Sequence, residues 1–296
     1  GTRVWDVDGR EYLDFVGGLA VNALGHAHPV VAEAVAEQAR KLIHTSNLYY
    51  TTPMIELAKL LVENSCFDRV FFCNSGTEAM EAAIKLARRW GHDTRDGAYG
   101  IIAFNDGFHG RSMGALAATG TERYRAPFAP LAPGFTHVNW NDIAAVKAAT
   151  DANTVAILAE PIQGESGVNM PGPGFFKELR AWCDENGLLL ILDEIQTGIG
   201  RTGTLWAYQQ EGIEPDIMCL AKGLAGGVPI GAILAREEIA AHLVKGDHGT
   251  TFGASPLSTA AGVATMRYII DNDVPAQGAR ASERFQARLR AMEDAI

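Results

Sequence analysis

The sequence has few cysteines and no long apolar run, and both absences narrow the class of protein. Only 4 of its 296 residues are cysteines: Cys66, Cys73, Cys183 and Cys219. Their scattered positions match no metal-ligand spacing, so we expect reduced thiols, no bound metal and a cytoplasmic location. Apolar runs such as residues 187–192 are far shorter than the roughly 20 residues that span a bilayer. We therefore expect no membrane-spanning helix.

Basic residues are also fewer than acidic ones. The chain has 25 Lys and Arg against 35 Asp and Glu, which gives a formal net charge of −10. This balance disfavours a general partner role with nucleic acid or an anionic membrane, although a local basic site for an anion stays open. A Gly-x-x-x-x-Gly-Lys-Ser/Thr motif is absent, and no Gly-x-Gly-x-x-Gly follows the first strand. A P-loop or dinucleotide-binding protein is therefore disfavoured.

Short apolar runs alternate with amphipathic helical patterns along the chain. The expected strands are residues 70–73, 100–104, 155–158, 188–192, 217–220 and 231–234, and the expected helices include 77–90, 141–149 and 174–185. Continuously apolar strands separated by helices predict an α/β fold, with a mostly parallel sheet covered on both faces. In such folds the ligand lies beyond the carboxyl ends of the strands. Residues that follow the strands are therefore the candidates for function.

The two ends of the chain suggest a fragment of a longer protein. Residues 5–10 are typical of a strand-turn-strand, and the chain begins at Gly1 without a methionine. A helical pattern of Phe285, Leu289, Met292 and Ile296 reaches the last residue without a C-cap. We expect three segments: an N-terminal segment (1–45), a large cofactor-binding domain (46–275) and the start of a truncated C-terminal small domain (276–296).

Lys222 stands at the end of the apolar run 217–220, at the start of a glycine-rich loop. A lysine at the end of a buried strand is costly unless it is paired or used. One common use is a covalent imine with a carbonyl cofactor, because desolvation makes the amine nucleophilic. This interpretation predicts an electron-sink aldehyde such as pyridoxal 5′-phosphate, with its other contacts elsewhere in the chain.

The first apolar run is followed by Ser75, Gly76 and Thr77, directly before a helical pattern. Free backbone N–H groups and a hydroxyl at a positive helix end can cradle a phosphate. An ordinary capping box, completed by Glu78, explains the same residues. Taken alone, this segment favours the ordinary cap.

Two later strand ends offer an aromatic side chain, a cation and carboxylates. Phe108 and Arg111 could form a stacking platform and an anion clamp, or belong to a solvated loop. Glu160 and Glu165 lie in a turn-rich loop that could simply be surface. That loop follows a strand expected to be central, which favours a function.

Asp193 closes the most apolar strand. A carboxylate facing a pyridine nitrogen would keep that nitrogen protonated, because an adjacent opposite charge favours the charged form. A helix cap or a metal ligand explains Asp193 alone equally well. Thr250 and Thr251 offer hydroxyls but are also common turn residues. Each part of such a cofactor nevertheless has a candidate near a strand end, and a joint match is far less probable by chance than any single one.

These segments together resemble the class III pyridoxal-phosphate-dependent aminotransferases. The matching segments are residues 75–79, 108–111, 160–165, 193–198, 220–224 and 248–253. The resemblance implies the fold type I of these transferases, a mostly parallel seven-stranded sheet sandwiched by helices. Residues 18–26 and 44–50 are most similar to the acetylornithine subgroup of the class.

The resemblance also implies roles for cofactor-binding residues. Lys222 would hold the pyridoxal phosphate covalently and then move protons, and Asp193 would pair with the pyridine nitrogen. Phe108 would stack on the ring. The remaining implied cofactor contacts are Ser75, Gly76 and Thr77 at the phosphate, Glu194, Ile195 and Gln196 near the ring, and Thr251 from the neighbouring subunit.

For the substrate, the resemblance implies that Arg111 takes a carboxylate and that Thr250 lies close to it. Glu165 would pair with an arginine in one half-reaction and release it in the other. A second carboxylate-binding arginine belongs to the expected missing domain. Ser166, beside Glu165, stands where many members of the acetylornithine subgroup have glycine.

The implied reaction is ping-pong transamination of an ω-amine, with N2-acetyl-L-ornithine as donor and 2-oxoglutarate as acceptor. Ornithine, succinylornithine, N-acetyl-lysine derivatives and 4-aminobutyrate are the alternative donors. The implied assembly is a homodimer in which Thr250 and Thr251 serve the partner's site. A different class of function also stays open, namely a cofactor-binding module without activity.

Overall fold

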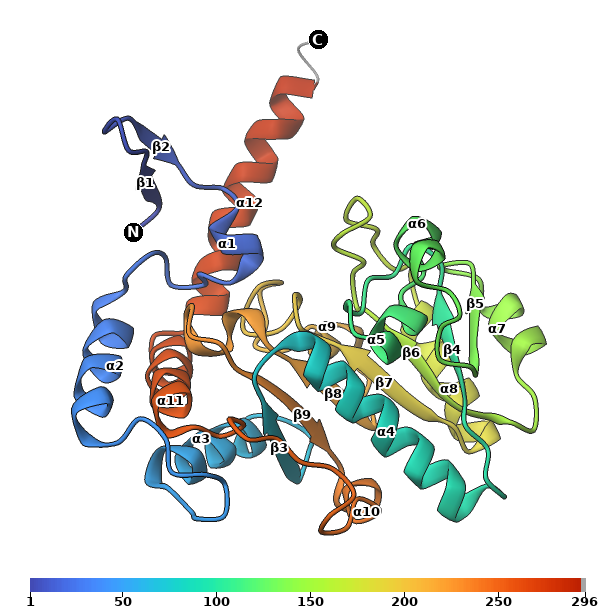
Figure 1. Cartoon of the computed structure of the whole chain (residues 1–296). Helices are drawn as coiled ribbons and strands as arrows, with labels where there is room; N and C mark the ends of the chain where they lie inside the picture. The colour runs from blue at the N-terminus through green and yellow to red at the C-terminus, as the bar shows by residue number, and fades with distance from the viewer. Residues whose placement is uncertain (294–296) are drawn as a thin grey trace.

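A seven-stranded sheet organises the chain (Figure 1). The computed structural model describes residues 1–293. The strand order is β3-β9-β8-β7-β6-β4-β5, and only β9 runs antiparallel to its neighbours. The strands are β3 (Arg69–Cys73), β4 (Gly100–Phe104), β5 (Phe135–Val138), β6 (Thr154–Ala159), β7 (Leu189–Asp193), β8 (Ile217–Leu220) and β9 (Gly231–Ala235). The predicted seven-stranded, mostly parallel α/β sheet is confirmed.

Six of these strands fall on the apolar runs of the sequence, whereas β5 does not. Strand β5 is an edge strand whose side chains at Phe135 and His137 are half-buried and at Thr136 exposed. An edge strand with one open face needs no continuous apolar run, so the sequence carries no strong signal for it. The predicted strand-turn-strand near the N-terminus is present as the antiparallel pair β1 (Arg3–Trp5) and β2 (Glu11–Leu13).

Helices cover both faces of the sheet. Successive residues of a strand point to opposite faces, so neighbouring residues belong to different buried clusters. Leu190 and Leu220 belong to one buried cluster, together with side chains of α3, α8 and α11. Ile191 and Cys219 belong to the other cluster, under α4. The covering helices are α3 (Thr52–Glu63), α4 (Gly76–Thr94), α8 (Phe175–Asn186) and α11 (Pro256–Asp271).

The three predicted helices correspond to α4, α7 (Ile143–Ala149) and α8. Ser75 caps α4, since its Oγ accepts a hydrogen bond of 3.3 Å from the backbone N–H of Glu78. Asp142 caps α7 in the same way through Ala145, at 2.9 Å. Helix α8 ends at Gly187, whose φ of +59° favours glycine. These local signals explain why the helix positions could be read from the sequence.

The helix α12 (Val274–Glu293) projects away from the sheet (Figure 1). The predicted pattern of Phe285, Leu289 and Met292 lies in α12, and all three side chains are exposed. Ile296 and the rest of 294–296 lie outside the described residues. The predicted domain boundary at 275/276 falls inside α12 and stays a prediction.

Short helices complete the chain around this framework. Helix α2 (Pro29–Lys41) packs against α11. The others are α1 (Gly17–Ala20), α5 (Met113–Ala118), α6 (Glu122–Arg125), η1 (Ala126–Phe128), α9 (Tyr208–Glu211), η2 (Lys222–Ala225) and α10 (Glu237–Ala240). Across residues 1–293, no helix has both the length and the apolar character required to cross a bilayer.

Candidate active site

A cavity of about 500 Å³ lies at the carboxyl ends of the parallel strands. Its volume is in the range that suits a small cofactor. Loops that follow β3, β4, β6, β7 and β8 all contribute to it. The predicted site residues that line it are Ser75, Gly76, Thr77, Phe108, Arg111, Glu165, Asp193, Ile195, Gln196 and Lys222. The fold thus brings together most of the residues selected from the sequence.

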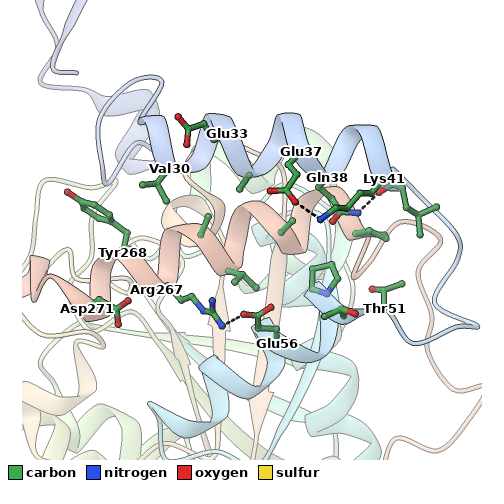
Figure 2. Close-up of a pocket in the computed structure, with 18 of the residues that line it drawn as sticks. Val30, Glu33, Glu37, Gln38, Lys41, Thr51, Glu56, Arg267, Tyr268 and Asp271 are labelled. Atoms are coloured by element: carbon green, nitrogen blue, oxygen red, sulfur yellow. Dashed lines mark hydrogen bonds and ion pairs between the residues drawn. The ribbon is translucent and has the colours of Figure 1, made fainter.

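A larger groove of about 970 Å³ lies elsewhere, between α2, α3 and α11 (Figure 2). Its two cations are already paired, Arg267 with Glu56 and Lys41 with Glu37. None of the predicted site residues lines this groove. Size alone therefore does not identify the chemical site, and we assign the chemistry to the smaller cavity.

Lys222 follows β8 after one intervening residue, and its side chain lines the cavity. Its φ of +31° lies in a region that non-glycine residues rarely adopt. Such strain persists only where the surrounding structure imposes it, and it gathers at functional sites. The only carboxylate in ion-pair range within the described chain is Glu165, with Oε1 at 3.9 Å from Nζ. The amine is therefore held loosely enough to react.

Asp193 is almost fully buried at the end of β7, with 4% of its surface exposed. Its Oδ2 lies 2.8 Å from Nδ1 of His109, and its Oδ1 accepts a hydrogen bond of 3.1 Å from the backbone N–H of Ile195. His109 is itself buried at the floor of the cavity. Two partners thus fix the direction of a carboxylate that faces the cavity.

The contact between His109 and Asp193 was not predicted from the sequence, where His109 is one residue of the loop 108–111. Strand β6 separates β4 from β7 in the sheet. His109 therefore reaches Asp193 across the end of an intervening strand, which only the strand order reveals. Its position beside Phe108 was the one available signal.

Glu160 joins two of the cavity's loops. Its Oε1 accepts from the backbone N–H of Phe108 at 2.8 Å, and its Oε2 accepts from that of Gly164 at 3.2 Å. Burial raises the pKa of the Glu160 carboxyl to about 7; nearby His109 opposes this rise and Asp193 adds to it. Glu160 is thus a buried group that titrates near neutral pH inside the site.

The start of α4 forms one wall of the cavity. Thr77 Oγ1 lies 2.7 Å from Ser112 Oγ and accepts a hydrogen bond of 3.1 Å from the backbone N–H of Ser112. Gly110 has φ +131°, and a Cβ placed there would lie 2.6 Å from Thr77 Oγ1. The close approach of these two loops therefore requires glycine at 110. The result is a narrow cradle at a positive helix end, which suits a phosphate.

Arg111 is exposed at the mouth of the cavity. Its Cζ lies 4.1 Å from the ring centroid of Tyr124 and 5.6 Å from that of Phe108. Two aromatic faces therefore orient the guanidinium. Within residues 1–293, no carboxylate forms an ion pair with it. Tyr124 was not selected from the sequence, because nothing in the local pattern links it to Arg111.

Glu194, predicted as a cofactor contact, does not line the cavity. It is fully buried, and its carboxylate accepts hydrogen bonds from the backbone N–H groups of Ala207 at 2.7 Å and Tyr208 at 2.8 Å. Successive residues at a strand end point to opposite sides, so Asp193 faces the cavity and Glu194 faces α9. Burial raises the pKa of Glu194 to about 7, against the backbone bonds that lower it.

Thr250 and Thr251 do not line this cavity. Thr250 Oγ1 accepts a hydrogen bond of 3.2 Å from Asn74 Nδ2, and Asn74 does line the cavity. Asn47 Nδ2 donates to the carbonyl oxygen of Thr250 at 2.8 Å. Thr251 is exposed. The service of both threonines to a partner's site stays a prediction.

The two buried glutamates give the protein a pH-dependent stability. Each has a folded-state pKa near 7, against an ordinary value of 4.5. The folded state therefore binds more protons in this window, and the stability falls as the pH rises from about 4.5 to about 7. A difference of this size corresponds to up to about 3 kcal/mol for each group.

The buried glutamates lower the free energy of unfolding at pH 8 relative to pH 5, while His137 and His248, whose pKa values burial lowers, act in the opposite sense. We expect urea denaturation to show that the contribution of Glu194, up to about 3 kcal/mol, is lost in Glu194→Gln, whereas in Glu63→Gln, at an exposed position, the change between the two pH values matches that of the parent chain. If the free energy of unfolding changes equally between pH 5 and pH 8 in Glu194→Gln and in the parent chain, the raised pKa of Glu194 is contradicted.

The cavity residues fit pyridoxal phosphate. They offer an amine for the aldehyde, a buried carboxylate for the ring nitrogen, a phenyl ring and a narrow phosphate cradle. A mostly parallel α/β sheet with this set at its strand ends defines a pyridoxal-phosphate-dependent enzyme. The chain belongs to the class-III aminotransferase family, whose model matches residues 1–296. It therefore transfers an amino group from an amino donor to a keto acid.

Three known proteins illustrate the relationship. An acetylornithine aminotransferase from Methanopyrus kandleri is 52% identical over 298 residues, covering 100% of this chain and 75% of the relative. The solved ornithine aminotransferase of Toxoplasma gondii superposes with a TM-score of 0.95 at 36% identity, covering 98% of this chain and 70% of that chain. The acetylornithine aminotransferase of Elizabethkingia anophelis has a TM-score of 0.86 at 36% identity, covering 100% and 72%.

Proposed function

We propose that the protein transfers the ω-amino group of N2-acetyl-L-ornithine to 2-oxoglutarate, giving N-acetyl-L-glutamate 5-semialdehyde and L-glutamate. The observation that carries this proposal is the cavity that unites Lys222, Asp193 and Arg111. The choice of donor rests on the name of the relative that is 52% identical.

When bound, pyridoxal phosphate supplies a carbonyl carbon and an electron-withdrawing ring. Lys222 Nζ would hold the cofactor covalently, and its amine would move a proton at the carbon that bears the substrate's amino group. The Asp193 carboxylate would favour the protonated ring nitrogen by its charge, and His109 keeps that carboxylate in place. Ser75, Gly76 and Thr77 would hold the phosphate at the start of α4.

Arg111 orients the donor. Its guanidinium binds the substrate carboxylate, so that the terminal amine rather than the α-nitrogen enters the cavity. In ornithine the α-nitrogen is a cation beside that carboxylate, and it would be repelled by Arg111. The acetyl group removes this charge. A like-charge repulsion of about 1.4 kcal/mol is enough for a tenfold preference.

A panel of donors tests the proposal with the cofactor-loaded chain and 2-oxoglutarate as acceptor. We expect kcat/KM for N2-acetylornithine to exceed that for ornithine by about tenfold or more. Succinylornithine, N-acetyl-lysine and 4-aminobutyrate form the rest of the panel. A higher value for any of these would replace the proposed donor. Cofactor binding without conversion of any donor would support a binding module without activity.

We also propose a cytoplasmic homodimer in which Thr250 and Thr251 of one subunit serve the partner's cavity. Support comes from the apolar side chains around this loop, since Leu48, Tyr50 and Phe252 are 83%, 88% and 61% exposed. Asn47 and Asn74 hold the loop beside the cavity mouth. Sedimentation velocity measures the assembly, and a particle of one chain at micromolar concentration would argue against it.

A further inference from the structure

The loop that carries Glu165 is closed at its base by a short antiparallel bridge. Gln163 N–H donates to the carbonyl oxygen of Asn169 at 3.1 Å, and Asn169 N–H donates to that of Gln163 at 2.9 Å. The Gln163 side chain is buried, and its Nε2 donates to the carbonyl oxygen of Asn105 at 2.9 Å. The base of the loop is therefore anchored to the segment that follows β4.

A single side chain ties this base to the tip of the loop. Asn169 Nδ2 donates to Gln163 Oε1 at 3.0 Å and to Ser166 Oγ at 2.9 Å. Both amide hydrogens of Asn169 are thus used inside the loop. We call Gln163, Ser166 and Asn169 the amide clasp.

The loop needs such a tie, because its backbone is unfavourable on its own. Gly167 has φ +122°, and Val168, a β-branched residue, has φ +60°. A β-branched residue at positive φ is a clear outlier and persists only when neighbours hold it. On the other side of Glu165, the Gly164 N–H donates to Glu160 Oε2. Glu165 therefore lies between two fixed points.

The position of Glu165 affects the two substrates differently. Its carboxylate lines the cavity and lies 3.9 Å from Lys222 Nζ. The donor brings one carboxylate and a cationic amine, whereas 2-oxoglutarate brings two carboxylates. A fixed carboxylate in the cavity therefore repels the acceptor more than the donor. Any contact that holds Glu165 in place shifts the balance between the two half-reactions.

We propose that Ser166 is a positioning residue for Glu165, acting through the amide clasp to set the relative use of donor and keto acid. The Ser166 hydroxyl, which accepts a hydrogen bond from Asn169 Nδ2, keeps the Glu165 carboxylate in the cavity. Without it the carboxylate moves away more readily, and the acceptor binds with less repulsion. This inference rests on the proposed function, because it uses the charges of the two substrates.

Ser166→Ala tests the proposal in the cofactor-loaded chain. We expect KM for 2-oxoglutarate to fall by roughly threefold to tenfold, with KM for the donor unchanged or higher and kcat within about twofold. Asn169→Ala should change the ratio of the KM for 2-oxoglutarate to the KM for the donor in the same direction. Ser166→Thr, which keeps the hydroxyl, should retain the parent values. Ser65→Ala is the control, because Ser65 Oγ also accepts a hydrogen bond, from the backbone N–H of Phe67 at 3.4 Å, and lies away from the cavity and this loop.

Hydrogen exchange gives a second readout that does not depend on activity. The backbone amides of Gln163 and Asn169 should exchange several-fold faster in Ser166→Ala than in the parent chain. If the parent chain transaminates, but Ser166→Ala shows unchanged amide exchange and an unchanged ratio of the two KM values, the proposed role of Ser166 is wrong and the proposed function stands. A parent chain that converts no amine donor would instead overturn the proposed function, and the exchange result would still decide whether the clasp exists.

Discussion

Replacing Lys222 with alanine is expected to lower the turnover by at least about 10³-fold. Proton transfer by a positioned side chain accounts for roughly 10² to 10⁴ of such a rate, and the covalent attachment is lost as well. Lys222 is the only lysine among the described residues that line the cavity. No neighbouring amine can therefore replace it.

The measurement combines steady-state rates with the absorbance of the bound cofactor. In Lys222→Ala the absorbance band of the covalently bound cofactor should disappear, while noncovalent binding persists through the phosphate cradle. Lys59→Ala is the matched control, because Lys59 is exposed on α3 and pairs only with Glu63 at 3.6 Å. A Lys222→Ala protein that keeps the band and a tenth of the turnover would disprove the assignment.

Replacing Asp193 with asparagine is expected to reduce kcat by about 10³-fold while leaving the fold intact. The exchange keeps the size of the side chain but removes its charge. Two opposite unit charges 4 Å apart are worth about 4 kcal/mol at an effective dielectric constant of 20. That energy corresponds to roughly a thousandfold change in rate if the interaction matters mainly in the transition state.

The variant Asp193→Asn should keep its His109 contact in part, so a loss of turnover would not simply report unfolding. Thermal unfolding checks this point directly. Asp184→Asn serves as the control, since Asp184 is 64% exposed and forms a surface pair with Arg180 that contributes little. Retention of more than a tenth of kcat in Asp193→Asn would show that the carboxylate does not act on the ring.

Much of this architecture was predictable because its signals are local. Apolar runs and caps such as Ser75 identified six of the strands and the helices between them. The rule that ligands bind at the carboxyl ends of parallel strands then led to Lys222 and Asp193. Strand β5 was not predicted, because one of its faces is open and its sequence therefore has no apolar run.

The rest of the site depends on the order of the strands across the sheet, which no local sequence pattern predicts. His109 reaches Asp193 only because the ends of β4 and β7 flank β6. Tyr124 meets Arg111 after a turn through α5 and α6. The orientation of Glu194 away from the cavity, by contrast, follows from a local rule, because adjacent residues at a strand end face opposite sides.

The central claim is that Lys222 Nζ holds the cofactor in this cavity. Borohydride reduction of the cofactor-loaded chain makes that carbon–nitrogen bond permanent, and peptide mass spectrometry then locates it. The account predicts a single modified peptide that contains Lys222. Modification at another lysine, or no modification of a protein that transaminates, would contradict it.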